Sequence, residues 1–182
     1  MAILHGWRFC PRCGGILDVA EAPARVACTS CGFVFYANSA PCACAIVEDD
    51  AGRVLLGRRA VEPYRGLWDT PGGYLHELED PLDGLRRELL EETGLAIEPK
   101  RFLGIWMDTY GDVPAANATL NLFWTARIVA GEPVAADDVA ELRWFAPDRL
   151  PSGGELAFSL LPSVFAAWRS GGRPVAGTPA TG

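Results

Sequence analysis

Three glutamates, Glu88, Glu91 and Glu92, stand at positions i, i+3 and i+4 of the run Pro81–Thr93. If this run is helical, the spacing places the three carboxylates on one face. Three like charges on one turn repel one another, and a cation would neutralise them. Because oxygen ligands at this density suit Mg²⁺ or Mn²⁺, the pattern predicts a divalent-metal site. The competing interpretation is a solvated acidic face, which is the commoner role of such a run.

The residues around these glutamates favour a helix. Asp80 is suited to cap its N-terminus, and Pro81 is suited to the first helical position. The run up to Gly94 is rich in Leu, Glu and Arg, which are good helix formers. Gly94 can end the helix in the left-handed conformation. The apolar side that would pack against the rest of the protein consists of Leu82, Leu85 and Leu89.

Further residues at fixed spacing surround this helix, in the order Gly73, Glu79, Arg87-Glu88-Leu89, Glu91-Glu92 and Gly94-Leu95. Nine positions are thus specified within residues 73–95. This pattern resembles the Nudix box, the signature of hydrolases that cleave pyrophosphate bonds in nucleoside diphosphate derivatives. The resemblance implies an α/β fold, namely an α/β/α sandwich with a mixed sheet. It also favours the metal site over the solvated acidic face.

The resemblance implies roles for the residues in and just before the box. The metal ligands that it implies are one backbone carbonyl and three carboxylates, from Gly72, Glu88, Glu91 and Glu92. Arg87 and Glu79 are implied as the partners that orient these glutamates. A simple ion pair between Arg87 and Glu79 is compatible with that role.

The general base stays open between two kinds of acid. In some Nudix enzymes the base belongs to the box, which makes Glu88 a candidate. In others it comes from a loop, and here such a loop carries Asp137 and Asp138, with Glu141 close behind. Asp138 stands six residues before Trp144, a spacing that suits the loop acid. An acidic loop residue is more often merely solvated.

Substrate contacts are expected from cations and aromatic residues near the box. The net charge of −7 at pH 7 opposes binding of a phosphate-bearing substrate, so bound metal and local arginines must offset it. The arginines concerned are Arg58, Arg59 and Arg65. The aromatic candidates for stacking on a base or a flavin are Trp68, Tyr74, Trp106, Phe123 and Trp124. Core packing is the commoner role for any one of them.

Four cysteines form two C-x-x-C pairs, Cys10 with Cys13 and Cys28 with Cys31. In a chain without an export signal, this spacing predicts a structural Zn²⁺ site with four thiolate ligands rather than disulfides. A glycine follows each pair, which suits the tight turns that aim thiolates at one ion. The pairs therefore predict a small zinc ribbon whose folding depends on the metal.

The chain of 182 residues is predicted to contain a zinc ribbon in residues 1–36, a Nudix hydrolase domain in residues 37–170 and a disordered tail in residues 171–182. In the main domain we expect strands at 40–48, 53–59, 101–110, 119–129 and 141–146. A Gly/Pro-rich loop is expected at 63–75 and a second helix near 161–169. Cys42 and Cys44 are expected to be buried thiols of the first strand.

Composition narrows the functional classes. No apolar run reaches membrane-spanning length and the N-terminus lacks signal-peptide features, so we expect a cytoplasmic protein with no membrane partner. No basic stripe is present, which argues against general nucleic-acid binding. The expected partner is a small nucleotide. The sequence leaves open NAD-capped RNA as a substrate and a homodimer as the assembly.

Two Nudix groups carry an N-terminal zinc ribbon. The NADH pyrophosphatase group, which includes NAD-cap hydrolases, has an SQPWPFP-type motif beyond the box, where this chain reads AIEPKRFLGIWMDTYGD. The segments FCPRCGG, CTSCG, GLWDTPGGYL and LAFS instead resemble FAD and ADP-ribose pyrophosphatases. The preferred prediction is cleavage of FAD, ADP-ribose or a similar dinucleotide with release of AMP. The alternatives are an NADH pyrophosphatase, a house-cleaning nucleoside triphosphatase, and a non-catalytic module that binds nucleic acid or protein.

Overall fold

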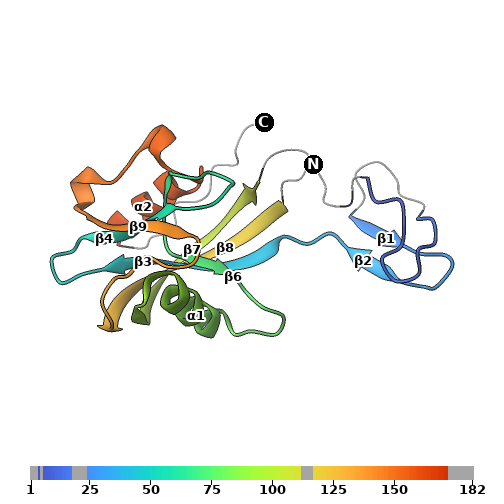
Figure 1. The fold of residues 1–182 in the computed structure, drawn as a ribbon, viewed down its shortest axis with the longest axis horizontal. Coiled ribbons are helices and arrows are strands. Elements are labelled where there is room, and N and C mark those ends of the chain that lie inside the picture. Colours follow the sequence, from blue (N-terminus) through green and yellow to red (C-terminus); the bar gives the residue numbers. More distant parts are fainter. Residues whose placement is uncertain (1–3, 5, 18–23, 112–116, 172–182) are drawn as a thin grey trace. The chain divides into compact units, whose positions relative to one another are not determined.

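The computed structural model describes residues 4, 6–17, 24–111 and 117–171 of the 182-residue chain. The chain forms two compact units (Figure 1). The first comprises Met1–Ala40 and Thr109–Ala118, and the second comprises Pro41–Asp108 and Thr119–Gly182. Most of the predicted tail, from residue 172 on, and the turn near Pro23 lie outside the described residues. Among the residues that are described, no helix is both long enough and apolar enough to cross a membrane.

The first unit contains two small hairpins, each with a C-x-x-C pair at its turn. In one hairpin, β1 (Arg25–Ala27) pairs antiparallel with β2 (Val34–Tyr36). In the other, Phe9 and Ile16 form an isolated antiparallel bridge. The buried core of this unit consists of Leu4, Cys10, Leu17, Val26 and Cys28. Such a small core does not stabilise a fold alone, so a metal held by the cysteines is the expected source of folding energy.

The second unit is organised around a seven-stranded sheet. Its strands are β3 (Ala40–Glu48), β4 (Val54–Arg59), β5 (Trp68–Asp69), β6 (Gly72–Tyr74), β7 (Ala96–Tyr110), β8 (Asn117–Ala130) and β9 (Val139–Phe145). Their order is β5-β4-β3-β8-β7, while β6 also pairs with β3 and β9 pairs with β4. These two additional pairings anchor two segments to the sheet. The strand β6 directly precedes the glutamate helix in the chain, and β9 directly follows the loop that carries Asp137 and Asp138.

Two helices cover opposite faces of this sheet, as Figure 1 shows: α1 (Pro81–Thr93) and α2 (Leu161–Arg169). The alternation of side chains along β3 explains the arrangement, because successive residues point to opposite faces. On one face Cys42, Cys44 and Ile46 pack with α2 residues that include Leu161, Val164 and Phe165. On the other face Ala43, Ala45 and Val47 pack with Leu85 and Leu89 of α1. The predicted α/β/α sandwich, both predicted helices and the buried thiols of Cys42 and Cys44 are confirmed.

The structure corrects several boundaries. Residues 63–75 were predicted as a loop, and this was wrong in part, because β5 and β6 lie within them. Gly72 and Gly73 pair with Cys44 and Ala43 of β3, and a pairing of this kind is set by a distant partner rather than by local propensity. The later strands also begin before their predicted starts: β7 at Ala96, β8 at Asn117 and β9 at Val139. Two short 3₁₀ helices, Pro147–Arg149 and Gly153–Glu155, precede α2.

Candidate active site and metal centre

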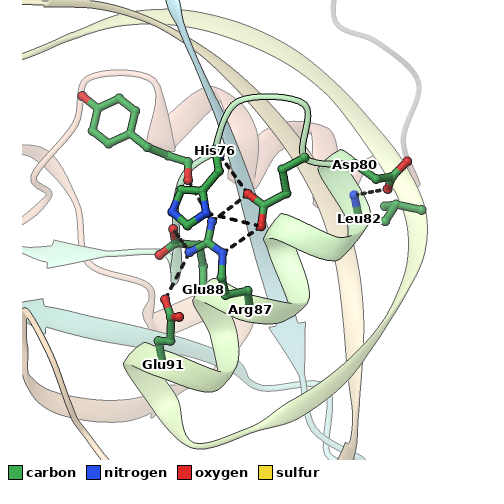
Figure 2. Close-up of polar contacts among 8 residues, drawn as sticks. His76, Asp80, Leu82, Arg87, Glu88 and Glu91 are labelled. Carbon is green, nitrogen blue, oxygen red and sulfur yellow. Dashed lines mark hydrogen bonds and ion pairs between the residues drawn. The ribbon is translucent and has the colours of Figure 1, made fainter.

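The glutamate helix α1 begins and ends with the capping residues expected of its sequence. The Asp80 carboxylate accepts a hydrogen bond of 2.8 Å from the backbone N–H of Leu82 (Figure 2). Pro81 occupies the first turn, where its missing N–H costs nothing. At the other end Gly94 adopts a φ of 69°, a left-handed conformation that glycine reaches without strain. Its N–H donates to the carbonyl of Leu90. These caps fix where along the chain the three glutamates fall.

Arg87 is the centre of the polar network on the exposed side of α1 (Figure 2). Its Nε and Nη2 each donate to a different oxygen of Glu79 at 2.8 Å, which is a bidentate pair. Its Nη1 donates to Glu88 at 2.6 Å and to Glu91 at 3.1 Å. Its Nη2 also reaches the backbone carbonyl of Tyr74. Hydrogen bonds from Arg87 lower the pKa of Glu79 to about 2. One guanidinium therefore sets the orientation of several box carboxylates.

The backbone of β6 lies directly against the carboxylates of α1. Glu92 is 8% exposed, and its Oε2 accepts a hydrogen bond of 2.9 Å from the N–H of Gly72. A Cβ added at Gly73 would lie 2.5 Å from Oε2 of Glu88, so a side chain at this position would collide with the carboxylate. Close approach of β6 to Glu88 therefore explains the glycine at position 73, whereas a Cβ at Gly72 would collide with the backbone carbonyl oxygen of Ala43 in β3.

A small pocket opens beside Glu92. Its lining includes Arg59 at the end of β4, Asp69 of β5, and Asp138 just before β9. Burial raises the pKa of Asp69 to about 7, although the charge of Arg59 opposes this shift. Burial also raises the pKa of Glu92 well above its ordinary value, and that of Glu88 to a smaller degree. Asp69 was absent from the predicted site residues. Its only sequence signal was its position in WDTPGG, immediately before the box.

A family model described as NUDIX domain matches residues 38–163, which is more than half of the chain. The chain belongs to the Nudix family. The match contains the whole glutamate helix, β6, and the pocket residues described above. It begins after the four cysteines, which lie outside the matched residues.

Relatives and solved structures agree with this assignment. An ADP-ribose pyrophosphatase from Methanocaldococcus jannaschii is 29% identical over 128 residues, which span 69% of this chain and 72% of the relative. An NAD-capped RNA hydrolase NudC from Stutzerimonas stutzeri is 27% identical over 148 residues, spanning 80% of this chain but 50% of that relative. A NUDIX hydrolase structure from Nitrosomonas europaea has a TM-score of 0.73 and 26% identity, and the match covers 92% of this chain and 95% of that chain.

The Nudix glutamates form a donor set that fits a divalent cation. Glu88 and Glu92 are carboxylates whose pKa is raised by burial, so bare negative charge is costly there and a bound cation would offset that cost. Carboxylate oxygens are the donors that Mg²⁺ and Mn²⁺ prefer. The three helix carboxylates do not converge within 4.8 Å of one another as the four thiols do. Arg87 holds Glu88 and Glu91 on its own side of the helix.

The predicted substrate-binding residues lie in different environments. Arg59 is buried in the pocket, with only 9% of its side chain exposed. Arg58 points elsewhere: it lies over the ring of Trp68, 5.0 Å from the ring centroid, and pairs with Glu141. Trp68 itself is buried in the core. Tyr74 is 38% exposed beside the box helix. The other aromatic candidates make ring contacts, Trp106 with Phe123 and Trp124 with Phe102, and Arg65 is exposed.

The loop between β8 and β9 brings one of its acids into the pocket. The N–H groups of Val134 and Ala136 donate to the last carbonyls of α1, those of Thr93 and Glu92, at 2.9 and 3.0 Å. These bonds hold the loop against the Nudix helix, and Asp138 then lines the pocket beside Glu92. Glu141 is not part of the pocket lining, because it pairs with arginines on β4 and β9.

The four cysteines of the first unit form a separate candidate metal centre. Their sulfur atoms all lie within 4.8 Å of one another. Cys10 and Cys31 are 3.7 Å apart, and Cys13 and Cys28 are 3.6 Å apart. Zn–S bonds of about 2.3 Å in a tetrahedron require sulfur separations of about 3.8 Å, so the cluster fits Zn²⁺.

The turns of the two knuckles explain how the thiols converge. Gly14 and Gly32 have φ angles of 73° and 71°, and their N–H groups donate to the carbonyls of Cys10 and Cys28. Only glycine reaches this left-handed region without strain.

Backbone N–H groups also donate to the sulfurs. The N–H of Cys31 donates to the sulfur of Cys28, and this is the main cause that lowers the pKa of Cys28 to about 6. At Cys13 the N–H of Gly15 favours the thiolate, but hydrogen bonds with the thiols of Cys31 and Cys28 outweigh it and raise the pKa of Cys13 to about 12. Holding all four sulfurs as thiolates therefore requires a bound cation.

Proposed function

We propose that this chain is a metal-dependent pyrophosphohydrolase that cleaves a nucleoside diphosphate linked to a second moiety, such as FAD or ADP-ribose, and releases AMP. The observation that carries the proposal is the network around Arg87, which orients Glu88 and Glu91 while Gly72 orients Glu92. A non-catalytic Nudix-like module has no need of this complete set of oriented glutamates. The four cysteines lie outside the residues that match the family.

The residues proposed to hold catalytic Mg²⁺ or Mn²⁺ are Glu88 and Glu92, with Glu91 and the carbonyl of Gly72 as further ligands. A divalent cation held there would neutralise phosphate charge and lower the pKa of a bound water. Arg87 and Glu79 act by fixing the carboxylates in place, and the bidentate geometry of their pair supports that role. Glu92 is additionally restrained by Gly72, so its carboxylate has little freedom before the metal binds.

The proton of the attacking water must pass to a base as its oxygen bonds to phosphorus and the P–O–P bridge breaks. We assign this role to Asp138. It lines the pocket with Glu92 and retains 33% exposure of its side chain, so water reaches it. Glu88, the alternative base, already accepts a hydrogen bond of 2.6 Å from Arg87 and is itself proposed as a metal ligand, so its carboxylate is engaged elsewhere.

The substrate assignment rests on chemistry shared with relatives. The relative from Methanocaldococcus jannaschii is named an ADP-ribose pyrophosphatase, and the match spans most of both chains. The NudC relatives favour a second candidate, the hydrolysis of NAD-capped RNA. We place it second because the chain has no SQPWPFP-type motif after the box. FAD remains a candidate on the four segments shared with FAD and ADP-ribose pyrophosphatases.

A hydrolysis screen tests this function. FAD, ADP-ribose, NADH, NAD-capped RNA and deoxynucleoside triphosphates are each incubated with the purified protein and Mg²⁺ or Mn²⁺. We expect AMP from FAD or ADP-ribose with the highest kcat/KM. A preference for NADH or capped RNA would move the assignment to the second candidate. Turnover of triphosphates alone would contradict the dinucleotide assignment.

The remaining assignments are proposals that accompany the enzyme function. Zn²⁺ is proposed as the structural ion of the four cysteines, on the sulfur separations described above. A cytoplasmic location and a homodimeric assembly stay predictions. Size-exclusion chromatography with light scattering measures the assembly directly.

A further inference from the structure

Arg59, the last residue of β4, carries a guanidinium that lies between two carboxylates from distant parts of the chain. Its Nη1 is 3.6 Å from Oδ2 of Asp69, and its Nη2 is 3.9 Å from Oδ2 of Asp138. Only 9% of the arginine side chain is exposed. A buried charge of this kind is tolerated when opposite charges and hydrogen bonds surround it. The guanidinium therefore links β5 to the loop before β9.

The fold fixes this guanidinium independently of the two acids. Its Nε donates to the carbonyl of Pro63 at 2.9 Å. The backbone of Arg59 is held as well, since its N–H donates to Leu67 at 3.0 Å and its carbonyl accepts from Gly66 at 2.9 Å. The ring of Phe158 packs against the side chain, with 5.7 Å between Cζ and the ring centroid. The position of both terminal nitrogens is thus determined before any substrate binds.

The backbone of the loop brings Asp138 to the same point. The N–H of Ala60 donates to the carbonyl of Asp138 at 2.7 Å. The pairing of β4 with β9 shifts register between Arg58 and Arg59, where Arg59 stands opposite Val139. Asp137 has a φ of 52°, in the left-handed region, so the chain turns sharply just before Asp138. An irregular entry into β9 thereby directs the loop acid to the pocket.

We propose that Arg59 is a positioning residue that holds the Asp138 carboxylate in the pocket beside Glu92, and that it acts on proton transfer through Asp138 rather than by binding a substrate phosphate. This inference rests on the proposed function. It replaces the phosphate-binding role that the sequence suggests for Arg59. An arginine that contacts phosphate needs donors directed at the substrate, whereas these donors face Pro63, Asp69 and Asp138.

Steady-state kinetics with ADP-ribose or FAD at saturating Mg²⁺ tests the inference. The variants are Arg59→Lys, Asp138→Asn and the double variant. General-base removal in Asp138→Asn should lower kcat by about 10²–10⁴-fold. Arg59→Lys keeps the positive charge but loses the branched contact, so kcat should fall at least tenfold while KM changes by less than threefold. The double variant should be no slower than Asp138→Asn alone, because the two residues act as one unit.

A matched arginine and a second acid variant complete the test. Arg127→Gln removes an exposed arginine that pairs with Glu98, and it should leave both constants unchanged. Asp138→Glu leaves the buried arginine intact and moves the acid by one methylene, so kcat should fall at least tenfold. This variant keeps the test decisive where thermal melts show that an Arg59 variant does not fold.

Each alternative result has a distinct meaning. A raised KM with retained kcat in Arg59→Lys would show phosphate binding and overturn the inference. Additive losses in the double variant, or wild-type turnover in Asp138→Glu, would also overturn it. A wild-type protein that hydrolyses no pyrophosphate substrate would instead refute the proposed function, whatever the variants do.

Discussion

Gly72 and Glu92 are twenty residues apart, and the backbone N–H of the first donates to the carboxylate of the second at 2.9 Å. The contact joins β6 to the buried side of α1. The hydrogen bond gives one oxygen of Glu92 a partner. Burial raises the pKa of this carboxyl group well above its ordinary value. Pairing of β6 with β3 holds the donor in place. The orientation of this Nudix carboxylate therefore depends on the sheet as well as on the helix.

The variant Glu92→Gln should separate catalysis from folding. A glutamine retains an oxygen that accepts from Gly72, so the fold stays intact. Because the folded pKa of Glu92 is raised, the wild-type protein loses unfolding free energy as pH rises through that pKa. The variant carries a neutral amide and avoids this loss, so at neutral pH it should melt at the same temperature as wild type or higher. We expect kcat to fall at least about a hundredfold, since loss of outer-shell partners alone costs about 10–100-fold. A ligand role for Glu92 would be contradicted if the variant turned over substrate as fast as wild type, or if Mn²⁺ raised its Tm by as much as it raises the Tm of wild type.

The variant Gly73→Ala tests the close approach of β6 to Glu88. Its Cβ would lie 2.5 Å from the carboxylate, which must move. Because small displacements of catalytic groups are costly, kcat should fall by roughly ten- to a hundredfold. Gly154→Ala is the matched control, since its Cβ would meet nothing within 4 Å. Equal kinetics for the two variants would show that Glu88 needs no fixed position.

Acid stability should depend on Glu79. Arg87 lowers the pKa of Glu79 from its ordinary 4.5 to about 2 in the folded protein. A depressed folded pKa contributes stability that is present above the unfolded value and is lost as pH falls toward the folded value. Between pH 5 and about 2, wild type should therefore lose more unfolding free energy than Glu79→Gln does. Urea melts of both proteins across this range measure the difference, and both lose zinc in acid alike. Parallel curves would refute the prediction.

The cysteine centre should hold one Zn²⁺ per chain that mild EDTA does not remove. Cys28→Ser removes one of the four converging thiols, so zinc content should fall and the first unit should unfold before the second. Cys42→Ser is the control, since Cys42 lies in the core of the second unit and should leave the zinc content unchanged. Metal analysis and limited proteolysis report the two effects. If protein purified under reducing conditions contained no zinc, the ribbon assignment would be contradicted.

The parts that could be predicted from the sequence are those whose causes are local. The caps at Asp80 and Gly94 determine the length of α1, and both are visible in a few neighbouring residues. The strand β6 could not be predicted in the same way, because Gly72 and Gly73 become a strand only through pairing with β3. Burial of Arg59 and the position of Asp69 in the pocket likewise depend on which strands flank β4. Tertiary contacts between distant segments decide such cases, and one sequence does not reveal them.

The bonds from Val134 and Ala136 to the end of α1 have a consequence for motion. The loop that carries Asp138 supplies partners for the carbonyls of Glu92 and Thr93, which a helix end otherwise leaves to solvent. The loop and the last helical turn must then open together in any local unfolding event. Amide deuterium uptake at Val134 and Ala136 should therefore follow that of the final turn of α1. In this sense the proposed base Asp138 and the glutamate helix α1 form one cooperative folding unit.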